Sequence, residues 1–257
     1  MYSFYSQNVW NCNPTGHRNP LIRALIEETD ADFCAFQECA PWSVRSGDAP
    51  LPHLMKNAYT EVDGKETNFT PIFYRTEKFR LIDSGYHLYT GLNDANSKSV
   101  TWAVLEDIST SNKIALMSTH FWWMFDSEAD NLQRLENAKE LKKLCDEVIK
   151  KFNVPVLIGG DFNNGTNAPQ GDEPYRKMLE MGFKDFRFCA RESTDSFTHR
   201  DCLLADRTQD TSSAPCSTID FIFTYGNGIE AVKFEIPNSR KALDSSDHLP
   251  LVAYFNI

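Results

Sequence analysis

The sequence predicts a single α/β (α+β) domain, over residues 1–257, in which mixed β-sheets are covered by helices. Segments with a strand pattern outnumber helical ones and often follow one another directly, which disfavours a strictly alternating parallel fold. The chain is long enough for one large core, and 41% of its residues are hydrophobic. It contains no internal repeat, low-complexity tract or Pro/Ser-rich linker that would mark a domain boundary.

Short alternating or continuous apolar runs predict the strands. In order, they cover residues 2–9, 33–36, 69–75, 79–87, 100–106, 113–119, 154–158, 219–224, 231–235 and 249–255. Turn-forming residues predict a loop at 11–16. The pair Gly159-Gly160 is expected to close the strand 154–158 with a tight turn.

Three segments have helical patterns. Asn19 and Pro20 predict the start of a first helix, with Asn19 as its cap, that ends near residues 29–30. The longest helix, 127–150, opens with Ser127 and Asp130 in a capping-box arrangement. A third covers 173–181. Apolar residues of the long helix recur every three or four positions and should form one core-facing stripe: Leu132, Leu135, Ala138, Leu141, Leu144 and Val148.

The composition of the chain indicates where the protein is located and which kinds of molecule it binds. A formal net charge of −10 opposes tight binding to polyanions, so a nucleic-acid substrate is possible but not favoured. The absence of a long apolar run predicts no membrane span, and the N-terminus does not resemble a secretory signal. Seven cysteines without CxxC pairs fit reduced thiols. These features favour a cytoplasmic protein and leave its oligomeric state open.

Six short segments place an amide, carboxylate or imidazole where a strand pattern meets a loop, which is where rigid sites are commonly assembled. Taken singly, most are weak signals. A core histidine is the plain alternative for His120, which precedes an aromatic run, whereas Asp220 lies in an apolar run where a carboxylate is costly unless paired or bound to a cation. The candidates are Asn8, Glu38, His120, Asp161, Asn163, Asp220, Asp247 and His248.

The order of these segments resembles the endonuclease/exonuclease/phosphatase superfamily over nearly the whole chain. The stretches 70–75 and 79–83, and Arg134 with Ala138 in the long helix, are also similar to that family. The resemblance implies a four-layer sandwich of two mixed sheets flanked by helices. It also implies hydrolysis of a phosphoester bond with Mg2+ or Mn2+ as the cofactor.

The resemblance assigns three residues to the metal. Glu38 is expected to be the principal ligand, with Asn8 beside it, and Asp247 is expected to bind directly or through water. Such oxygen donors suit Mg2+, which keeps several of its own waters.

Five residues are assigned to the chemistry by the same resemblance. Asp161 should orient or deprotonate the attacking water, and Asn163 should hold that water or a phosphate oxygen. His120 and His248 should donate to the phosphate, while Asp220 should fix the tautomer of His248.

The chain also departs from the family pattern. Trp10 replaces a frequent acidic residue, and Thr218 replaces a frequent arginine. The aromatic stretch 121–125 either packs in the core or forms a wall for the substrate, in which case Trp122 and Trp123 would contact it. Two further residues, Arg75 and His199, could reach the site, although a structural role is favoured for both.

The leading function is therefore a phosphodiesterase acting on a small, lipid-like or nucleic-acid substrate. The alternative is a phosphomonoesterase acting on sugar or inositol phosphates. An inactive binding module on the same fold is a remote alternative, opposed by the intact acid and imidazole set. No Gly-x-Ser-x-Gly motif or Cys/His arrangement supports a metal-independent hydrolase.

Overall fold

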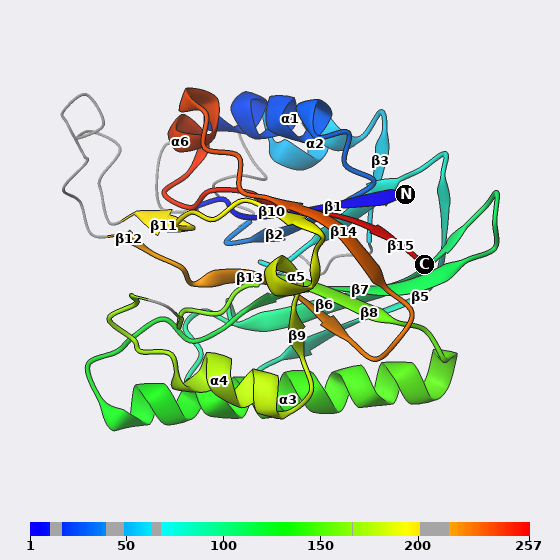
Figure 1. Ribbon diagram of the computed structural model, residues 1–257. Coiled ribbons are helices and arrows are strands. Elements are labelled where there is room, and N and C mark those ends of the chain that lie inside the picture. Colours follow the sequence, from blue (N-terminus) through cyan, green and yellow to red (C-terminus); the bar gives the residue numbers. More distant parts are fainter. Residues whose placement is uncertain (11–16, 40–48, 63–67, 166, 201–215) are drawn as a thin grey trace.

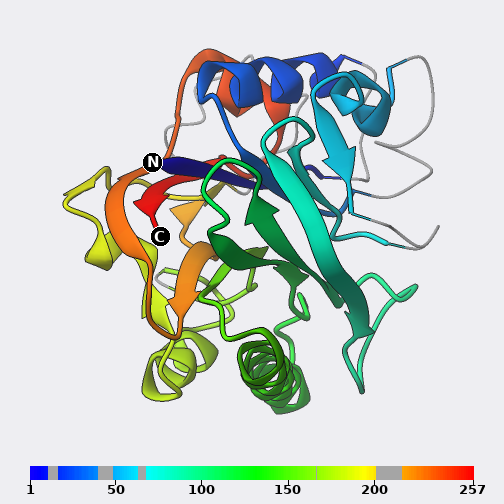
Figure 2. The same ribbon diagram turned by 90° about the vertical axis from the view of Figure 1, so that its right-hand side faces the viewer.

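Two mixed sheets face each other and helices cover their outer faces, so the molecule has the four layers expected from the sequence (Figures 1 and 2). The computed structural model describes residues 1–10, 17–39, 49–62, 68–165, 167–200 and 216–257. The loop predicted at 11–16 lies outside the described residues.

The first sheet has seven strands in both parallel and antiparallel pairs. Its central strand β1 is antiparallel to β15 and parallel to β2. The strand order is β10 (Glu192–Ser193), β14 (Glu230–Glu235), β15 (Leu251–Asn256), β1 (Tyr2–Asn8), β2 (Phe33–Gln37), β4 (Ile72–Arg75) and β3 (Tyr59–Glu61).

The second sheet has six strands, of which β7 and β8 form the parallel pair. Its order is β5 (Phe79–Leu88), β6 (Ser99–Asp107), β7 (Lys113–His120), β8 (Val156–Asp161), β13 (Asp220–Tyr225) and β9 (Lys184–Asp185). A separate two-stranded ribbon pairs β11 (His199–Arg200) with β12 (Cys216–Ser217). The sequence patterns failed to predict the shortest strands, which are two or three residues long.

The helices form the two outer layers (Figure 1). On the first sheet lie α1 (Arg18–Glu28), α2 (Leu51–Met55) and α6 (Arg240–Ser245). On the second lie α3 (Glu128–Phe152) and α4 (Glu173–Glu180), while α5 (Phe186–Cys189) follows β9. No helix among the described residues is long and apolar enough to cross a membrane.

Two local predictions for the helices were wrong. His17, not Asn19, is the N-cap of α1, and the Asn19 side chain donates instead to the main-chain oxygen of Ala49. The second wrong prediction concerns the core-facing stripe of α3. The predicted capping box of this helix, between Ser127 and Asp130, is present. However, Leu132 is 55% exposed, because the buried positions in that turn belong to the polar residues that follow it, Gln133 and Arg134.

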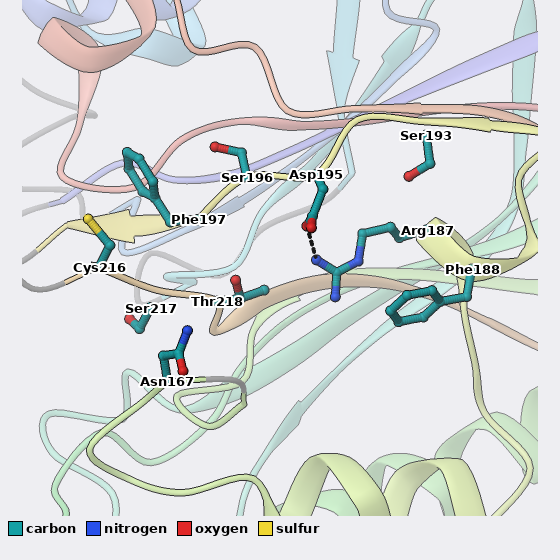
Figure 3. A pocket seen from close by; sticks show the side chains of 10 residues that line it. All are labelled: Asn167, Arg187, Phe188, Ser193, Asp195, Ser196, Phe197, Cys216, Ser217 and Thr218. Atoms are coloured by element: carbon teal, nitrogen blue, oxygen red, sulfur yellow. Dashed lines mark hydrogen bonds and ion pairs between the residues drawn. The ribbon is translucent and has the colours of Figure 1, made fainter.

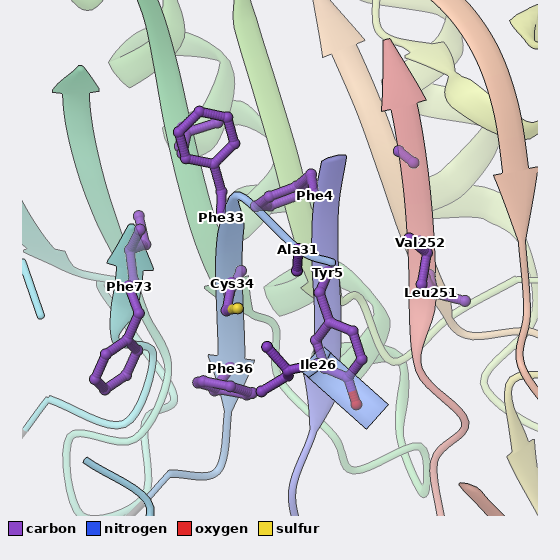
Figure 4. Close-up of a cluster of buried hydrophobic side chains, with 14 of the residues drawn as sticks. Phe4, Tyr5, Ile26, Ala31, Phe33, Cys34, Phe36, Phe73, Leu251 and Val252 are labelled. Carbon is purple, nitrogen blue, oxygen red and sulfur yellow. The ribbon is translucent and has the colours of Figure 1, made fainter. Parts of the chain in front are cut away.

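The larger hydrophobic cluster joins both sheets to α1. Figure 4 shows part of it, with Ile26 of α1 beside Tyr5 and Phe36 of the first sheet. Successive strand residues point to opposite faces, so Phe4 faces the second sheet when Tyr5 faces the helix. A second cluster packs α3 against the other sheet through residues such as Ala138 and Leu141.

The glycine pair does not end β8, contrary to the expectation of a turn, because this strand continues to Asp161. A Cβ at Gly159 would lie 2.6 Å from the Oγ of Ser6 on the facing sheet. A Cβ at Gly160 would lie 2.6 Å from the main-chain oxygen of Thr119. The glycines therefore allow close packing around the strand that carries Asp161.

Candidate active site

The predicted site residues meet at one end of the two sheets, opposite the end that holds both chain termini (Figure 1). In the parallel pair β7–β8, His120 lies opposite Asp161. In the antiparallel pair β8–β13, Asp220 lies opposite Asp161 on the side of β8 that faces away from β7. Strand register therefore places three functional groups side by side across the second sheet. Asn8 and Glu38 come from the matching ends of β1 and β2 in the first sheet.

Asn8 connects the two sheets at this end. Its Nδ2 donates to Glu38 Oε1 at 3.0 Å and to Asp161 Oδ2 at 2.9 Å. Its Oδ1 accepts from the main-chain nitrogen of Trp10 at 2.9 Å. The amide is thereby fixed in one orientation between two carboxylates. Glu38 follows β2 with a φ of 53°, a left-handed conformation that is costly for residues other than glycine and asparagine.

His120 is buried beside both carboxylates. Its Nε2 lies 3.5 Å from Asp161 Oδ2 and 3.9 Å from Glu38 Oε1. Burial, followed by the charges of Lys98 and His248, holds the pKa of His120 well below its usual value. The imidazole is therefore neutral near pH 7 and carries one N–H donor.

Asp161 is a buried carboxylate at the centre of the site. Burial and the nearby charge of Asp220 raise the pKa of Asp161 to about 7, against the opposing effect of His248. Its Oδ1 accepts from the main-chain nitrogen of Asn163 at 2.9 Å. The Asn163 side chain donates to the main-chain oxygen of Phe121 at 3.1 Å, which ties the loop after β8 to the loop after β7.

His248 and Asp220 form an acid–imidazole pair. The Nδ1 of His248 lies 2.9 Å from Asp220 Oδ2, and its Nε2 lies 3.9 Å from Asp161 Oδ2. Burial alone would lower the pKa of His248, but Asp220 and then Asp247 raise it well above its usual value. The ring is therefore cationic, with Nδ1 donating to Asp220 and Nε2 directed at the centre of the site.

Asp247 completes the acidic set. Burial and the charge of Glu38 raise the pKa of Asp247 to about 6, although His248 lowers it. The hydroxyl of Ser246 donates to the main-chain oxygen of Asn8 at 2.7 Å, which fixes this loop against β1.

A pocket of about 500 Å³ opens over these groups. It brings together predicted residues and others that the sequence patterns did not single out. Its lining residues are Trp10, Glu38, Asp94, Ser97, Lys98, Trp123, Phe125, Asp161, Asn163, Gln170, His199, Ile219, Asp247 and His248.

A second pocket, of about 660 Å³, holds none of the predicted site residues (Figure 3). Its guanidinium, Arg187, is paired with Asp195 at 3.3 Å and lies 3.8 Å from Asp185. Because the predicted residues line the first pocket and this cation is already matched by two carboxylates, the first pocket is the candidate active site.

Comparisons with known proteins show the family of this chain and its likeness in fold to solved structures. The sequence profile of the Endonuclease/Exonuclease/phosphatase family matches residues 5–248. The chain belongs to this family. A curated relative, the CCR4-Not complex 3'-5'-exoribonuclease subunit Ccr4 of Yarrowia lipolytica, is 25% identical over 59% of this chain. The match spans only 28% of the length of that relative.

Solved structures of family members share the fold. A mannosyl-6-phosphatase from Bacteroides thetaiotaomicron is 18% identical, with a TM-score of 0.75 over 100% of both chains. A family member from Bacteroides vulgatus is 21% identical, with a TM-score of 0.75 over 100% of this chain and 98% of the other. TDP2 of D. rerio, in complex with single-stranded DNA product, is 14% identical, with a TM-score of 0.75 over 100% and 99%.

The site contains residue sets suited to a divalent metal ion, as expected of this family. Glu38, His120 and Asp161 offer ligand atoms within 4.8 Å of one another, and so do two overlapping sets that include His248. Carboxylate oxygens dominate the first set, and they fit a hard cation. The raised pKa of Asp161, caused by burial and by Asp220, indicates crowded negative charge that a cation would relieve.

Two of the predicted substrate contacts do not face the pocket. Trp122 is buried and its Nε1 donates to Asp130 Oδ1 at 2.6 Å. Arg75 lies at the other end of the first sheet, because its neighbour Tyr74 pairs with Phe33 at the start of β2. Its guanidinium donates to the main-chain oxygen of Ala31 at 3.0 Å.

Two aromatic residues from separate segments do line the pocket. Trp123 is 46% exposed, and its Nε1 donates to Asp94 Oδ2 at 2.9 Å. His199, for which a structural role was favoured, packs on His248 with ring centroids 4.6 Å apart. Trp122 packs against α3 through its bond to Asp130, whereas Trp123 lies outside that contact and faces the pocket.

Proposed function

We propose that this family member is a divalent-metal-dependent hydrolase of a phosphoester bond. The observation that carries the proposal is the setting of Asp161. Asn8, His120 and His248 surround its carboxylate at 2.9, 3.5 and 3.9 Å. Asn8 and His120 end strands of the two sheets, and His248 lies between α6 and β15. Membership of the Endonuclease/Exonuclease/phosphatase family supports this chemistry.

The proposed cofactor is Mg2+ or Mn2+, held by Glu38 and by Asp247, directly or through water. Asn8 orients Glu38 through its 3.0 Å hydrogen bond. A bound divalent ion would neutralise charge on the phosphoryl group and on the leaving oxygen.

Asp161 is proposed to accept a proton from the attacking water. As that water oxygen forms its bond to phosphorus, the bond from phosphorus to the leaving oxygen breaks. In the metal-free protein, burial and the charge of Asp220 raise the pKa of Asp161 to about 7. A bound divalent cation would lower this pKa, so the carboxylate would be ionised at neutral pH and able to accept a proton. Asn163 fixes the carboxylate through its main-chain nitrogen, and its side-chain amide, which already donates to the main-chain oxygen of Phe121, is proposed to contact the water or a phosphate oxygen through its remaining groups.

Two imidazoles are proposed to bind the phosphoryl oxygens in different charge states. Neutral His120 offers a single N–H, whereas cationic His248 offers Nε2–H with a positive charge. Asp220 is a positioning residue, because it contacts Nδ1 of His248 on the side away from the pocket.

The pocket wall supports a substrate whose organic group packs on aromatic rings, and a phosphodiester of this kind is the first candidate. Trp123 and Phe125 are 46% and 49% exposed, and both line the pocket beside the acidic groups. Exposed rings of this kind stack on flat or apolar groups. Small, lipid-like and nucleic-acid substrates remain within this class, and the net charge of −10 weighs against long polyanions.

A phosphomonoesterase acting on a sugar or inositol phosphate is the second candidate. The similarity in fold to a mannosyl-6-phosphatase over the full length of both chains supports it. A cytoplasmic location remains a prediction from the sequence.

Hydrolysis of bis(p-nitrophenyl) phosphate and of p-nitrophenyl phosphate, in Mg2+, in Mn2+ and in EDTA, tests the proposal. We expect metal-dependent cleavage with the diester preferred, and loss of activity in Glu38→Gln. Preference for the monoester would favour the second candidate. Equal cleavage in EDTA and in Mg2+ would overturn metal dependence.

A further inference from the structure

The two members of the acid–imidazole pair come from different parts of the fold. Asp220 begins β13 in the second sheet, whereas His248 lies between α6 and β15, a strand of the first sheet. Their side chains nonetheless meet at 2.9 Å and are nearly fully buried. Because a hydrogen bond depends steeply on distance and angle, the main chain at both residues has to be held in place.

Thr198, directly before β11, contacts the main chain at both members of the pair. Its hydroxyl oxygen accepts from the main-chain nitrogens of Ile219 and Asp220 at 3.0 and 3.1 Å. Its main-chain oxygen accepts from the nitrogen of Leu249, the residue after His248, at 2.7 Å. One residue therefore joins the segment that carries the acid to the segment that carries the imidazole.

Main-chain pairing continues past Thr198. His199 forms an antiparallel bridge with His248, and the centroids of their rings are 4.6 Å apart. The next main-chain nitrogen, that of Arg200, donates to the main-chain oxygen of Asp247 at 3.1 Å. The segment that carries the imidazole is thus aligned along this strand, and its ring is packed on one side.

The Thr198 hydroxyl is a hydrogen-bond acceptor in a place that water does not reach, since the residue is 1% exposed. Valine is close to threonine in shape but has no acceptor, so it would leave the nitrogens of Ile219 and Asp220 without this partner. A buried N–H without an acceptor is costly. The main chain would therefore shift to find another acceptor, and the carboxylate of Asp220 would move with it.

We propose that Thr198 is a positioning residue of the active site, which aligns the Asp220 carboxylate with Nδ1 of His248. Through this alignment it keeps Nε2 of His248 directed at the phosphoryl group of the substrate. This inference rests on the proposed function and adds to it a residue from outside the six predicted segments. A contact that matters mainly in the transition state lowers kcat more than it raises KM.

Matched variants separate the hydroxyl from the shape of the side chain. Thr198→Val removes the acceptor, whereas Thr198→Ser keeps it. Thr194→Val is the control, since the hydroxyl of Thr194 also accepts from a main-chain nitrogen, that of Ile236 at 2.9 Å, where β10 and β14 end at the edge of the first sheet. Asp220→Asn is the reference, because it changes the acceptor at Nδ1 of His248 directly.

The first readout is the nitrogen NMR chemical shift of Nδ1 of His248, in the metal-free protein at a single neutral pH. We expect Thr198→Val to move this shift in the same direction as Asp220→Asn. Thr198→Ser and Thr194→Val should match wild type. This readout does not require turnover, and a general loss of stability in a protein that is still folded would not move it in that direction.

The second readout is steady-state hydrolysis of bis(p-nitrophenyl) phosphate in Mg2+. Thr198→Val should lower kcat at least about fivefold, the scale of one hydrogen bond, and change KM by less than about twofold. Thr198→Ser and Thr194→Val should stay within about twofold of wild type in both constants. Rescue by serine would assign the effect to the hydroxyl.

Thermal melting checks that Thr198→Val is folded, and Thr198→Ala replaces it if it is not. An unchanged Nδ1 shift in the folded variant would overturn the positioning role, and so would equal losses of kcat in Thr198→Val and Thr198→Ser. If the shifts change as expected but wild type cleaves no phosphoester in Mg2+, the proposed function fails and the alignment of the pair by Thr198 stands. Metal-dependent cleavage by wild type with wild-type kcat in folded Thr198→Val gives the reverse result.

Discussion

Substitution of Asp220 by Asn would remove the charge that holds His248 in its cationic form. Asp220 Oδ2 lies 2.9 Å from Nδ1 of His248, and both side chains are nearly fully buried. A hydrogen bond to a charged group contributes about 1.5–3 kcal/mol. Since about 1.4 kcal/mol corresponds to one pKa unit or a factor of ten in rate, the change should lower the pKa of His248 by about one to two units. We expect kcat to fall by about 10- to 100-fold or more.

Two assays check this prediction. The pKa of His248 is followed by NMR of its imidazole nitrogens in the metal-free protein, and kcat is measured in Mg2+. Asp185→Asn is the matched control, because Asp185 is also a buried aspartate but contacts Tyr175 and Arg187 outside the pocket. It should lose stability and keep kcat. An Asp220→Asn protein with an unchanged His248 pKa and unchanged kcat would refute the role given to this pair.

Three further predictions concern packing, substrate contact and acid stability. Gly159→Ala should lower the free energy of unfolding by about 1–3 kcal/mol in urea, because its Cβ would lie 2.6 Å from Ser6 Oγ, and an unchanged midpoint would contradict this. Trp123→Ala should raise KM for an aromatic diester more than it lowers kcat, whereas Trp122→Ala should chiefly lower stability; equal kinetic effects would contradict the assignment of the wall. Partial burial raises the pKa of Asp107, but hydrogen bonds from Ser109 and Tyr2 lower this pKa to about 2. The stabilising effect of the Asp107 carboxylate is therefore complete above its pKa in the unfolded chain, near 4, and disappears as pH falls through about 2. Acid unfolding of Asp107→Asn should therefore depend less on pH over this range than that of wild type, and identical profiles would contradict the account.

Much of the site could be predicted because its residues end strands. A strand of predictable length delivers its last side chain to the edge of a sheet, so Asn8, Glu38, His120 and Asp161 were visible as strand ends. The order of the segments then indicated the family, which the profile match over residues 5–248 confirms. The two mixed sheets and their covering helices were predicted on the same basis.

The remaining features depend on tertiary packing. Lys98 lies in a polar connection between two strands, and nothing in its neighbours along the chain indicates that it is buried against His120. Trp122 and Trp123 are adjacent and chemically alike, and only the position of α3 decides which one faces the pocket. Arg75 was considered because it belongs to a family-like stretch, but strand register places it at the opposite end of the sheet.

The central claim is that Asp161 acts as the base of a metal-dependent hydrolase. The most direct measurement is the Mg2+-dependent kcat of Asp161→Asn beside wild type and Asp185→Asn, with folding of each protein checked by thermal melting. The proposal predicts a loss of at least about 100-fold for Asp161→Asn, the scale of general base catalysis, and near wild-type turnover for Asp185→Asn. A folded Asp161→Asn protein that kept wild-type turnover would contradict it.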